Sequence, residues 1–135
     1  MSSQLFDRNL ILVVDDDREF LESVVIMLDK EIPGVKLFKA LDGITASAIY
    51  ENSNPAPAVI ILDMMLPKRS GFLVLEKIKR TSPAKPLPHV IMVTANPGAR
   101  HKAYAEMLGV FEYLRKPFPM FFLLQAVQKA RAAIN

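Results

Sequence analysis

The stretch that decides the fold is Leu10-Ile11-Leu12-Val13-Val14-Asp15-Asp16-Asp17. An apolar run without polar alternation is typical of a strand buried on both faces of a parallel sheet. Three acids follow this run at once, and apolar residues then recur with helical spacing from 18 to 30, beginning at Phe20. A buried strand, a charged turn and an amphipathic helix predict the first unit of an α/β protein.

The same pairing of a strand with a helix recurs along the whole chain. Strands are expected over residues 10–14, 35–39, 58–62, 90–93 and 111–114, and helices over 18–30, 43–52, 71–80, 99–108 and after Pro117 to about 133. The inner face of the last helix is expected to be Phe122, Leu123, Ala126, Val127 and Ala130. The run over 35–39 carries two lysines, which favours a place at or near a sheet edge. Prolines over 53–57 and 83–88, and the sequence Asn96-Pro97-Gly98, mark expected connections.

The composition is that of a domain that folds without covalent staples. The 135 residues are 51% apolar, and 17 Lys and Arg against 14 Asp and Glu give a formal net charge of +3. One domain over residues 1–135, with its core over about 9–133, is expected. The lack of cysteine excludes disulfides and thiolate chemistry and fits a cytoplasmic location. No membrane span or signal peptide is expected, and the scattered basic residues do not predict direct nucleic-acid binding.

Chemically active side chains follow four of the expected strands. The first strand ends at the three acids, the third at Asp63, the fourth at Thr94 and the fifth just before Lys116. Ligands of open parallel sheets bind at the carboxyl ends of the strands, so these side chains are expected to converge. Clustered carboxylates suit a hard cation such as Mg²⁺, and a lysine with a hydroxyl beside them suits phosphate. Asp63 could then act as a nucleophile toward a phosphoryl group.

Four motifs carry these residues in order along the chain. They are Val13-Val14-Asp15-Asp16-Asp17, Leu62-Asp63-Met64-Met65-Leu66-Pro67 with Ser70-Gly71, Val93-Thr94-Ala95, and Tyr113-Leu114-Arg115-Lys116-Pro117-Phe118. With these motifs the sequence resembles the CheY-like receiver domains of two-component response regulators over nearly its whole length. The resemblance implies a flavodoxin-like (βα)5 three-layer sandwich, with a five-stranded parallel sheet of order 2-1-3-4-5.

The resemblance also implies how a phosphoryl group would be accepted. Asp63 is expected to be the phosphoacceptor. Asp16, Asp63 and the main-chain carbonyl of Met65 are expected to bind Mg²⁺, with Asp15 helping through a bound water. Lys116 is expected to contact both the phosphoryl group and Asp63.

A second set of residues is implied to report the phosphorylated state. Thr94 is expected to move and form a hydrogen bond to the phosphoryl group, and Tyr113 is expected to turn inward as it does so. The peptide bond between Lys116 and Pro117 is expected to be cis. One departure from the family pattern is Arg69, at a position where receivers commonly carry an apolar residue.

Each of these residues also has a simpler interpretation. Asp16 with Glu19, or Asp17 alone, could cap the first helix without binding a metal. Asp63 could start a turn and Lys116 could be a solvated loop lysine. Thr94 could be an ordinary strand residue, and Tyr113 could serve only in packing. It is their joint occurrence that favours a phosphorylation site.

The expected function is that of a phosphorylatable switch. A histidine kinase or phosphotransfer protein would donate the phosphoryl group, and the domain would catalyse its own phosphorylation and dephosphorylation without being an enzyme on a separate substrate. The surface formed by 99–108, 111–114 and the last helix would control a downstream protein or output domain, and a homodimer through these helices is possible. Two alternatives remain open: a small-molecule phosphatase with an aspartyl-phosphate intermediate, and a receiver-like binding module that is never phosphorylated.

Overall fold

The computed structural model of the chain describes residues 6–80, 87–95 and 98–134. Strands and helices alternate throughout this part. The strands are β1 (Phe6–Val14), β2 (Lys36–Ala40), β3 (Ala56–Asp63), β4 (His89–Thr94) and β5 (Glu112–Arg115), and the helices are α1 (Arg18–Glu31), α2 (Gly43–Asn52), α3 (Gly71–Arg80), α4 (Ala99–Met107) and α5 (Met120–Ala132). The alternation of strands and helices predicted from the sequence is confirmed.

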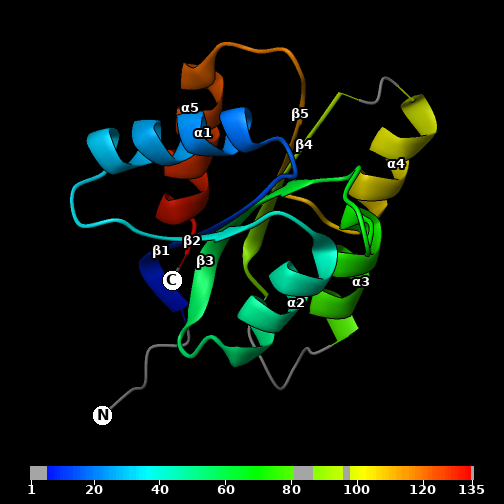
Figure 1. The fold of residues 1–135 in the computed structure, drawn as a ribbon, viewed down its shortest axis with the longest axis horizontal. Helices are drawn as coiled ribbons and strands as arrows, with labels where there is room; N and C mark the ends of the chain where they lie inside the picture. Colours follow the sequence, from blue (N-terminus) through cyan, green and yellow to red (C-terminus); the bar gives the residue numbers. More distant parts are fainter. Residues whose placement is uncertain (1–5, 81–86, 96–97, 135) are drawn as a thin grey trace.

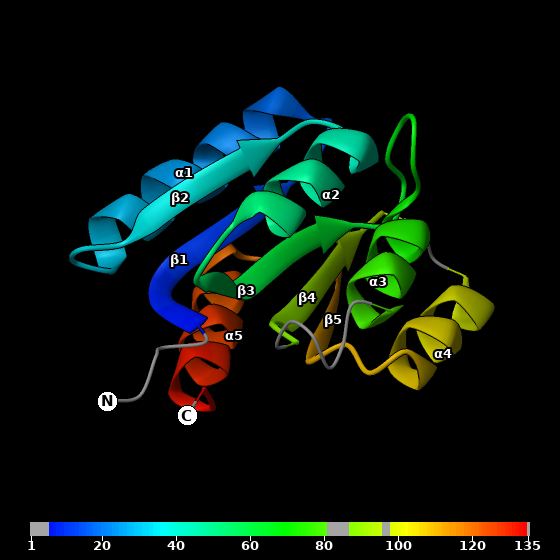
Figure 2. The same ribbon diagram turned by 90° about the horizontal axis from the view of Figure 1, so that it is seen from below.

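The five strands form one parallel sheet of order β2-β1-β3-β4-β5, as predicted. Helices α1 and α5 cover one face, and α2, α3 and α4 lie over the other (Figure 1, Figure 2). Because side chains alternate along a strand, successive residues of the central strands enter opposite cores. In β1, Ile11 and Val13 pack toward α1 and α5, whereas Leu12 and Val14 pack toward α2 and α3. The result is a three-layer sandwich.

Strand β4 is one residue longer than predicted at each end, and β1 and β3 are longer because they pair beyond a break in the sequence pattern. Phe6 and Asp7 pair with Ala56 and Pro57, and the register shifts between Asp7 and Ile11. This part of β1 contains polar residues, and β3 contains Pro57, so apolar runs in the sequence do not predict the extra pairing. Strand β2 begins one residue later than predicted, at Lys36, and lies at the sheet edge where its lysines remain exposed.

The helix boundaries follow local signals, with one correction to the predicted inner face of α5. Leu123, Ala126, Val127 and Ala130 are buried, but Phe122 is 44% exposed. Phe122 is one residue away from the buried stripe, and it stacks edge-on against the exposed Phe121.

The remaining expectations concern the connections and the membrane. Gly109 follows α4 with φ +83°, the left-handed conformation predicted for it after a helix end. Of the proline-rich connection over 83–88, residues 83–86 lie outside the described residues, as do Asn96 and Pro97. Among the helices that the structure describes, none has both the length and the apolar character needed to cross a membrane.

Candidate phosphoryl-acceptor site

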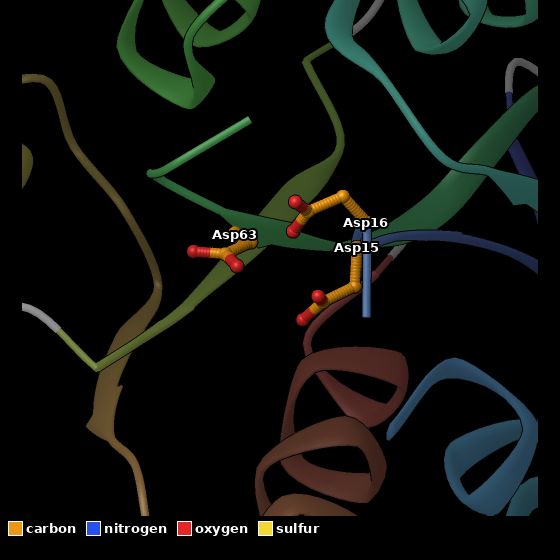
Figure 3. A group of neighbouring side chains, drawn as sticks. All are labelled: Asp15, Asp16 and Asp63. Carbon is orange, nitrogen blue, oxygen red and sulfur yellow. The ribbon is translucent and has the colours of Figure 1, made fainter. Parts of the chain in front are cut away.

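The residues singled out from the sequence meet at one edge of the sheet. Asp15 and Asp16 follow β1, Asp63 is the last residue of β3, Thr94 is the last residue of β4, and Lys116 follows β5. All strands are parallel, so their carboxyl ends lie together. Figure 3 shows the carboxylates of Asp15, Asp16 and Asp63 on the same side of the β1 and β3 ends.

Three carboxylates form the centre of this site. One oxygen from each of Asp15, Asp16 and Asp63 lies within 4.8 Å of the others. Asp15 is 1% exposed and Asp63 is 6% exposed, whereas Asp16 lies at the surface. Two buried carboxylates beside a third are costly in electrostatic energy unless a cation compensates them.

Lys116 supplies one such compensating charge. Its Nζ atom donates a hydrogen bond to Oδ2 of Asp15 over 2.7 Å and lies 3.6 Å from Oδ2 of Asp63. The main-chain N–H of Lys116 donates to the carbonyl of Thr94 over 2.8 Å, which fixes the start of the loop against β4. The Lys116–Pro117 peptide bond is cis, the isomer that the family resemblance implies.

The electrostatic environment of Asp63 disfavours its ionised form. Burial raises the pKa of its carboxyl above the ordinary value, and the charges of Asp15 and Asp16 raise it further. A hydrogen bond from the N–H of Met65 and the charge of Lys116 act in the opposite direction without cancelling the rise. Ionisation of Asp63 is therefore unfavourable, mainly because the carboxylate is removed from water and partly because two other acids lie near it.

Two close approaches fix the loop that follows Asp63. The N–H of Met65 donates to Oδ1 of Asp63 over 3.0 Å, and the N–H of Gly71 donates to the carbonyl of Met64 over 2.9 Å. A Cβ atom at Gly71 would lie 2.2 Å from the carbonyl oxygen of Asp63. Only glycine allows α3 to begin so close to the strand that carries Asp63. The main chain of Met65 lies at the site, and its carbonyl as a metal ligand stays a prediction.

The three consecutive acids have separate structural roles. Asp17 caps α1, because its side chain accepts a hydrogen bond from the N–H of Phe20 over 3.2 Å. Oδ1 of Asp15 accepts from the N–H of Asp17 over 2.9 Å, while Oδ2 accepts from Lys116. Asp16 is neither the cap nor buried. Capping therefore accounts for Asp17 and leaves Asp15 and Asp16 for the carboxylate cluster.

Thr94 and Tyr113 lie on the same face of the sheet. Thr94 is fully buried at the end of β4, and it shares a face with Met92 because side chains two residues apart point the same way. Met92 pairs in register with Tyr113 of β5, and both belong to the core under α2 and α3. Burial raises the pKa of the partly buried Tyr113 phenol, against a smaller opposing effect of Arg115. Coupling between Thr94 and Tyr113 stays a prediction.

Two features of the site region do not follow from the sequence. Helical spacing places Phe20 on the inner face of the first helix, but its ring lies under Lys116, with Nζ 4.1 Å from the ring centroid. The sequence does offer one indication that Phe20 lies near the site: it belongs to the first turn of a helix that begins directly after the acid cluster. Arg69 stands out in the sequence only as an unusual residue. Its carbonyl is 1.9 Å from where a Cβ of Gly43 would lie, so the Asp63 loop packs directly on the start of α2.

The donor set fits a hard divalent cation. Carboxylate oxygens are the preferred ligands of Mg²⁺. The pKa of Asp63 is raised chiefly by burial and further by the charges of Asp15 and Asp16, so a bound cation would favour its ionised form. Asp15, Asp16 and Asp63 are thus compatible with Mg²⁺.

Comparison with known families agrees with this geometry. The sequence model described as "Response regulator receiver domain" matches residues 11–128. The chain belongs to this family. Its motifs and its sheet order are those of CheY-like receivers, so the identification made from the four motifs is confirmed.

Individual relatives support the same assignment. The chain is 35% identical over 118 residues to the DNA-binding dual master transcriptional regulator RpaA of Synechocystis sp., covering 87% of this chain and 47% of that protein. It is 31% identical over 118 residues to Protein PilG of Pseudomonas aeruginosa, covering 87% and 84%. A crystal structure of a CheY-like response regulator receiver domain protein from Methanospirillum hungatei JF-1 superposes with a TM-score of 0.81 at 27% identity, covering 92% and 94%. The receiver chain thus spans about half of the RpaA regulator but most of PilG.

Proposed function

We propose that this receiver domain is switched by transfer of a phosphoryl group to Asp63. The observation that carries the proposal is the position of the Asp63 carboxylate: it is buried at a strand end, clustered with two other acids and 3.6 Å from the ammonium of Lys116. A carboxylate so placed is presented as a nucleophile beside a donor that can bind a phosphoryl oxygen. Phosphohistidine on a histidine kinase or phosphotransfer protein is the proposed donor.

The transfer is a displacement at phosphorus. An oxygen of Asp63 forms a bond to phosphorus while the bond from phosphorus to the donor imidazole nitrogen breaks, and that nitrogen keeps the electron pair. Lys116 is close enough to exchange part of its contact with Asp15 for a phosphoryl oxygen. The switch is reset by hydrolysis: water attacks phosphorus, the bond from phosphorus to the Asp63 oxygen breaks, and inorganic phosphate leaves, which restores the carboxylate of Asp63.

Asp16, Asp63 and the carbonyl of Met65 are the proposed direct ligands of Mg²⁺, and Asp15 is proposed to contact it through a bound water. When bound, Mg²⁺ supplies positive charge that offsets the carboxylates and the charge of the incoming phosphoryl group. The residues themselves then orient Asp63: the N–H of Met65 holds one carboxylate oxygen, and Lys116 approaches the other.

Phosphorylation is proposed to change the surface formed by α4, β5 and α5. An aspartyl phosphate adds negative charge next to Thr94, whose hydroxyl could donate a hydrogen bond to it. Because Thr94 and Tyr113 share one face of the sheet, movement of Thr94 would alter the packing of Tyr113. The altered surface would bias binding of a downstream protein or output domain.

Several further expectations remain predictions alongside this proposal. They are the extent of one receiver unit over residues 1–135, the cytoplasmic location, homodimerisation, and the lack of direct nucleic-acid contact by this domain. The match of the family model to residues 11–128 supports the first of them.

The test is incorporation of labelled phosphate from acetyl phosphate or phosphorylated kinase, with and without Mg²⁺. Wild type should be labelled only with Mg²⁺, and Asp63→Asn should not be labelled. Asp17→Asn is the matched control, because it makes the same chemical change two residues from Asp15 and keeps a good helix cap. Equal labelling of the Asp63 variant would refute the assignment, and an unlabelled wild type would favour the binding-module alternative.

A further inference from the structure

Lys116 has a third neighbour besides Asp15 and Asp63. Its Nζ atom lies 4.1 Å from the centroid of the Phe20 ring, a short distance for contact between an ammonium group and an aromatic face. The side chain of Lys116 is only 18% exposed, so much of the water that would weaken this contact is excluded. The ammonium group therefore contacts an aromatic ring as well as two carboxylates.

The ring of Phe20 is itself held in place. Phe118 packs against it edge to face, with ring centroids 6.2 Å apart and planes at 82°. Both rings also pack on the core between the sheet and helices α1 and α5. This arrangement limits rotation of the Phe20 ring and keeps its face toward Lys116.

A lysine needs such support because its side chain is long and flexible. The four-carbon stem has many rotamers, and an ammonium group is a point charge without the planar geometry that orients an arginine. Contact with Asp15 alone would leave Nζ free to swing around that carboxylate. The ring of Phe20 closes one side and favours positions from which Nζ can reach Asp63.

We propose that Phe20 is a positioning residue for the phosphoryl transfer, holding the ammonium of Lys116 between Asp15 and Asp63 through a cation–π contact reinforced by Phe118. This inference rests on the proposed function of Asp63 as the phosphoacceptor. The proposed role differs from a purely hydrophobic one, because a residue of the same volume that lacks an electron-rich face would not replace Phe20.

The first experiment detects the contact without requiring phosphorylation. In protein labelled with ¹³C-lysine, the ε-methylene signal of Lys116, assigned by its loss in Lys116→Met, should be shifted upfield by the ring current of Phe20. Phe20→Leu should abolish this shift, and Phe20→Tyr should preserve it. Phe122→Leu is the control, because Phe122 stacks on Phe121 and is 44% exposed. An ε-methylene signal at the position of a solvated lysine in wild type would overturn the proposal.

The second experiment measures the functional effect with graded replacement of Phe20 by mono-, di- and trifluorophenylalanine. Fluorine draws electrons from the ring face with little change of volume, so a cation–π contact weakens stepwise. The rate of phosphorylation from acetyl phosphate should fall stepwise to about one third to one tenth of the wild-type rate. The same series at Phe38, which is 41% exposed on the edge strand β2, should leave the rate unchanged, and a flat series at position 20 would refute the proposal. A wild type that shows the ring-current shift but no labelling would instead refute the assignment of Asp63.

Discussion

Nζ of Lys116 is hydrogen-bonded to Oδ2 of Asp15 at 2.7 Å and lies 3.6 Å from Oδ2 of Asp63. The lysine is thus shared between two buried carboxylates but closer to the one that is not the proposed acceptor. The hydrogen bond to Asp15 holds the ammonium group next to Asp63, so a phosphoryl group on Asp63 would lie close to a cation that is already in position. The same pairing keeps the charge of the almost fully buried Asp15 from being uncompensated.

Replacement of Lys116 should therefore make the free energy of unfolding depend more strongly on Mg²⁺. Lys116→Met keeps the aliphatic volume but leaves two buried carboxylates without their ammonium partner, and should lower the free energy of unfolding by about 3 kcal/mol in EDTA. Mg²⁺ should restore more stability to this variant than to wild type, because the metal binds the folded state and offsets the same charges. Urea unfolding with and without Mg²⁺ measures both effects.

The control for this prediction is a lysine in a surface ion pair. Lys36 contacts Asp7 at 2.7 Å with its side chain 65% exposed. Lys36→Met should cost less than about 1 kcal/mol, with no added response to Mg²⁺. An equal response of the two variants to Mg²⁺ would show that Lys116 does not offset the charge of the carboxylate cluster.

The pH dependence of stability should reveal the unfavourable ionisation of Asp63. Burial, chiefly, and the charges of Asp15 and Asp16 raise the pKa of this carboxyl in the folded protein above its ordinary value of 3.8. A raised folded pKa contributes stability that is fully present below 3.8 and is lost as pH rises through the folded pKa. At pH near 7 without metal, the ionised Asp63 therefore destabilises the fold.

Asp63→Asn should accordingly be more stable than wild type in EDTA near pH 7. The advantage should shrink as pH falls through the folded pKa of Asp63, because wild type then takes up its proton. Urea unfolding from pH 7 to pH 4 measures the difference, with Asp17→Asn as a variant whose difference from wild type should not follow this course. A constant difference between Asp63→Asn and wild type across this range would contradict the assigned environment of Asp63.

The consecutive acids Asp16 and Asp17 should give opposite phenotypes. Asp17→Ala removes the hydrogen bond to the N–H of Phe20 at the start of α1 and should cost about 1 kcal/mol, with Mg²⁺ affinity retained. Asp16→Ala removes an exposed carboxylate that caps nothing, so stability should change little while Mg²⁺ affinity falls at least about tenfold. Urea unfolding and titration with Mg²⁺ distinguish the two roles. Similar loss of Mg²⁺ affinity in both variants would show that the cap and the metal site are not separate.

Much of the fold and site is predictable because both depend on patterns local in sequence. Continuous apolar runs identify the central strands, and parallel pairing then brings every carboxyl end to one edge, so Asp15, Asp63 and Thr94 can be placed together from the sequence alone. Sheet order and residue roles follow from the family resemblance. The extra pairing of Phe6 and Asp7 is not predictable, since it depends on a partner strand far along the chain.

The contacts that the sequence does not reveal are those set by tertiary packing. Helical spacing predicts that Phe20 faces the core, which it does, but its additional contact with Lys116 depends on the path of the loop after β5 and is visible only in the structure. In the same way, periodicity assigns Phe122 to the core, whereas in the structure it is 44% exposed and lies one residue outside the buried stripe. Gly71 is recognisable in the sequence only as part of a motif, and its close approach to Asp63 is visible only in the structure.

Gly71→Ala should separate the placement of Asp63 from general stability. A Cβ atom there would lie 2.2 Å from the carbonyl oxygen of Asp63 and 2.7 Å from Cα of Met64, so backbone must move. Overpacking of this kind should cost about 1–3 kcal/mol, and displacement of the acceptor should slow phosphorylation about tenfold to a hundredfold. Gly34→Ala is the control: Gly34 has φ +78° and a Cβ added to it would meet no atom within 4 Å, so this variant should lose about 1 kcal/mol from backbone conformation alone with an unchanged phosphorylation rate. If both variants slowed phosphorylation equally, reduced stability rather than the position of Asp63 would be the cause.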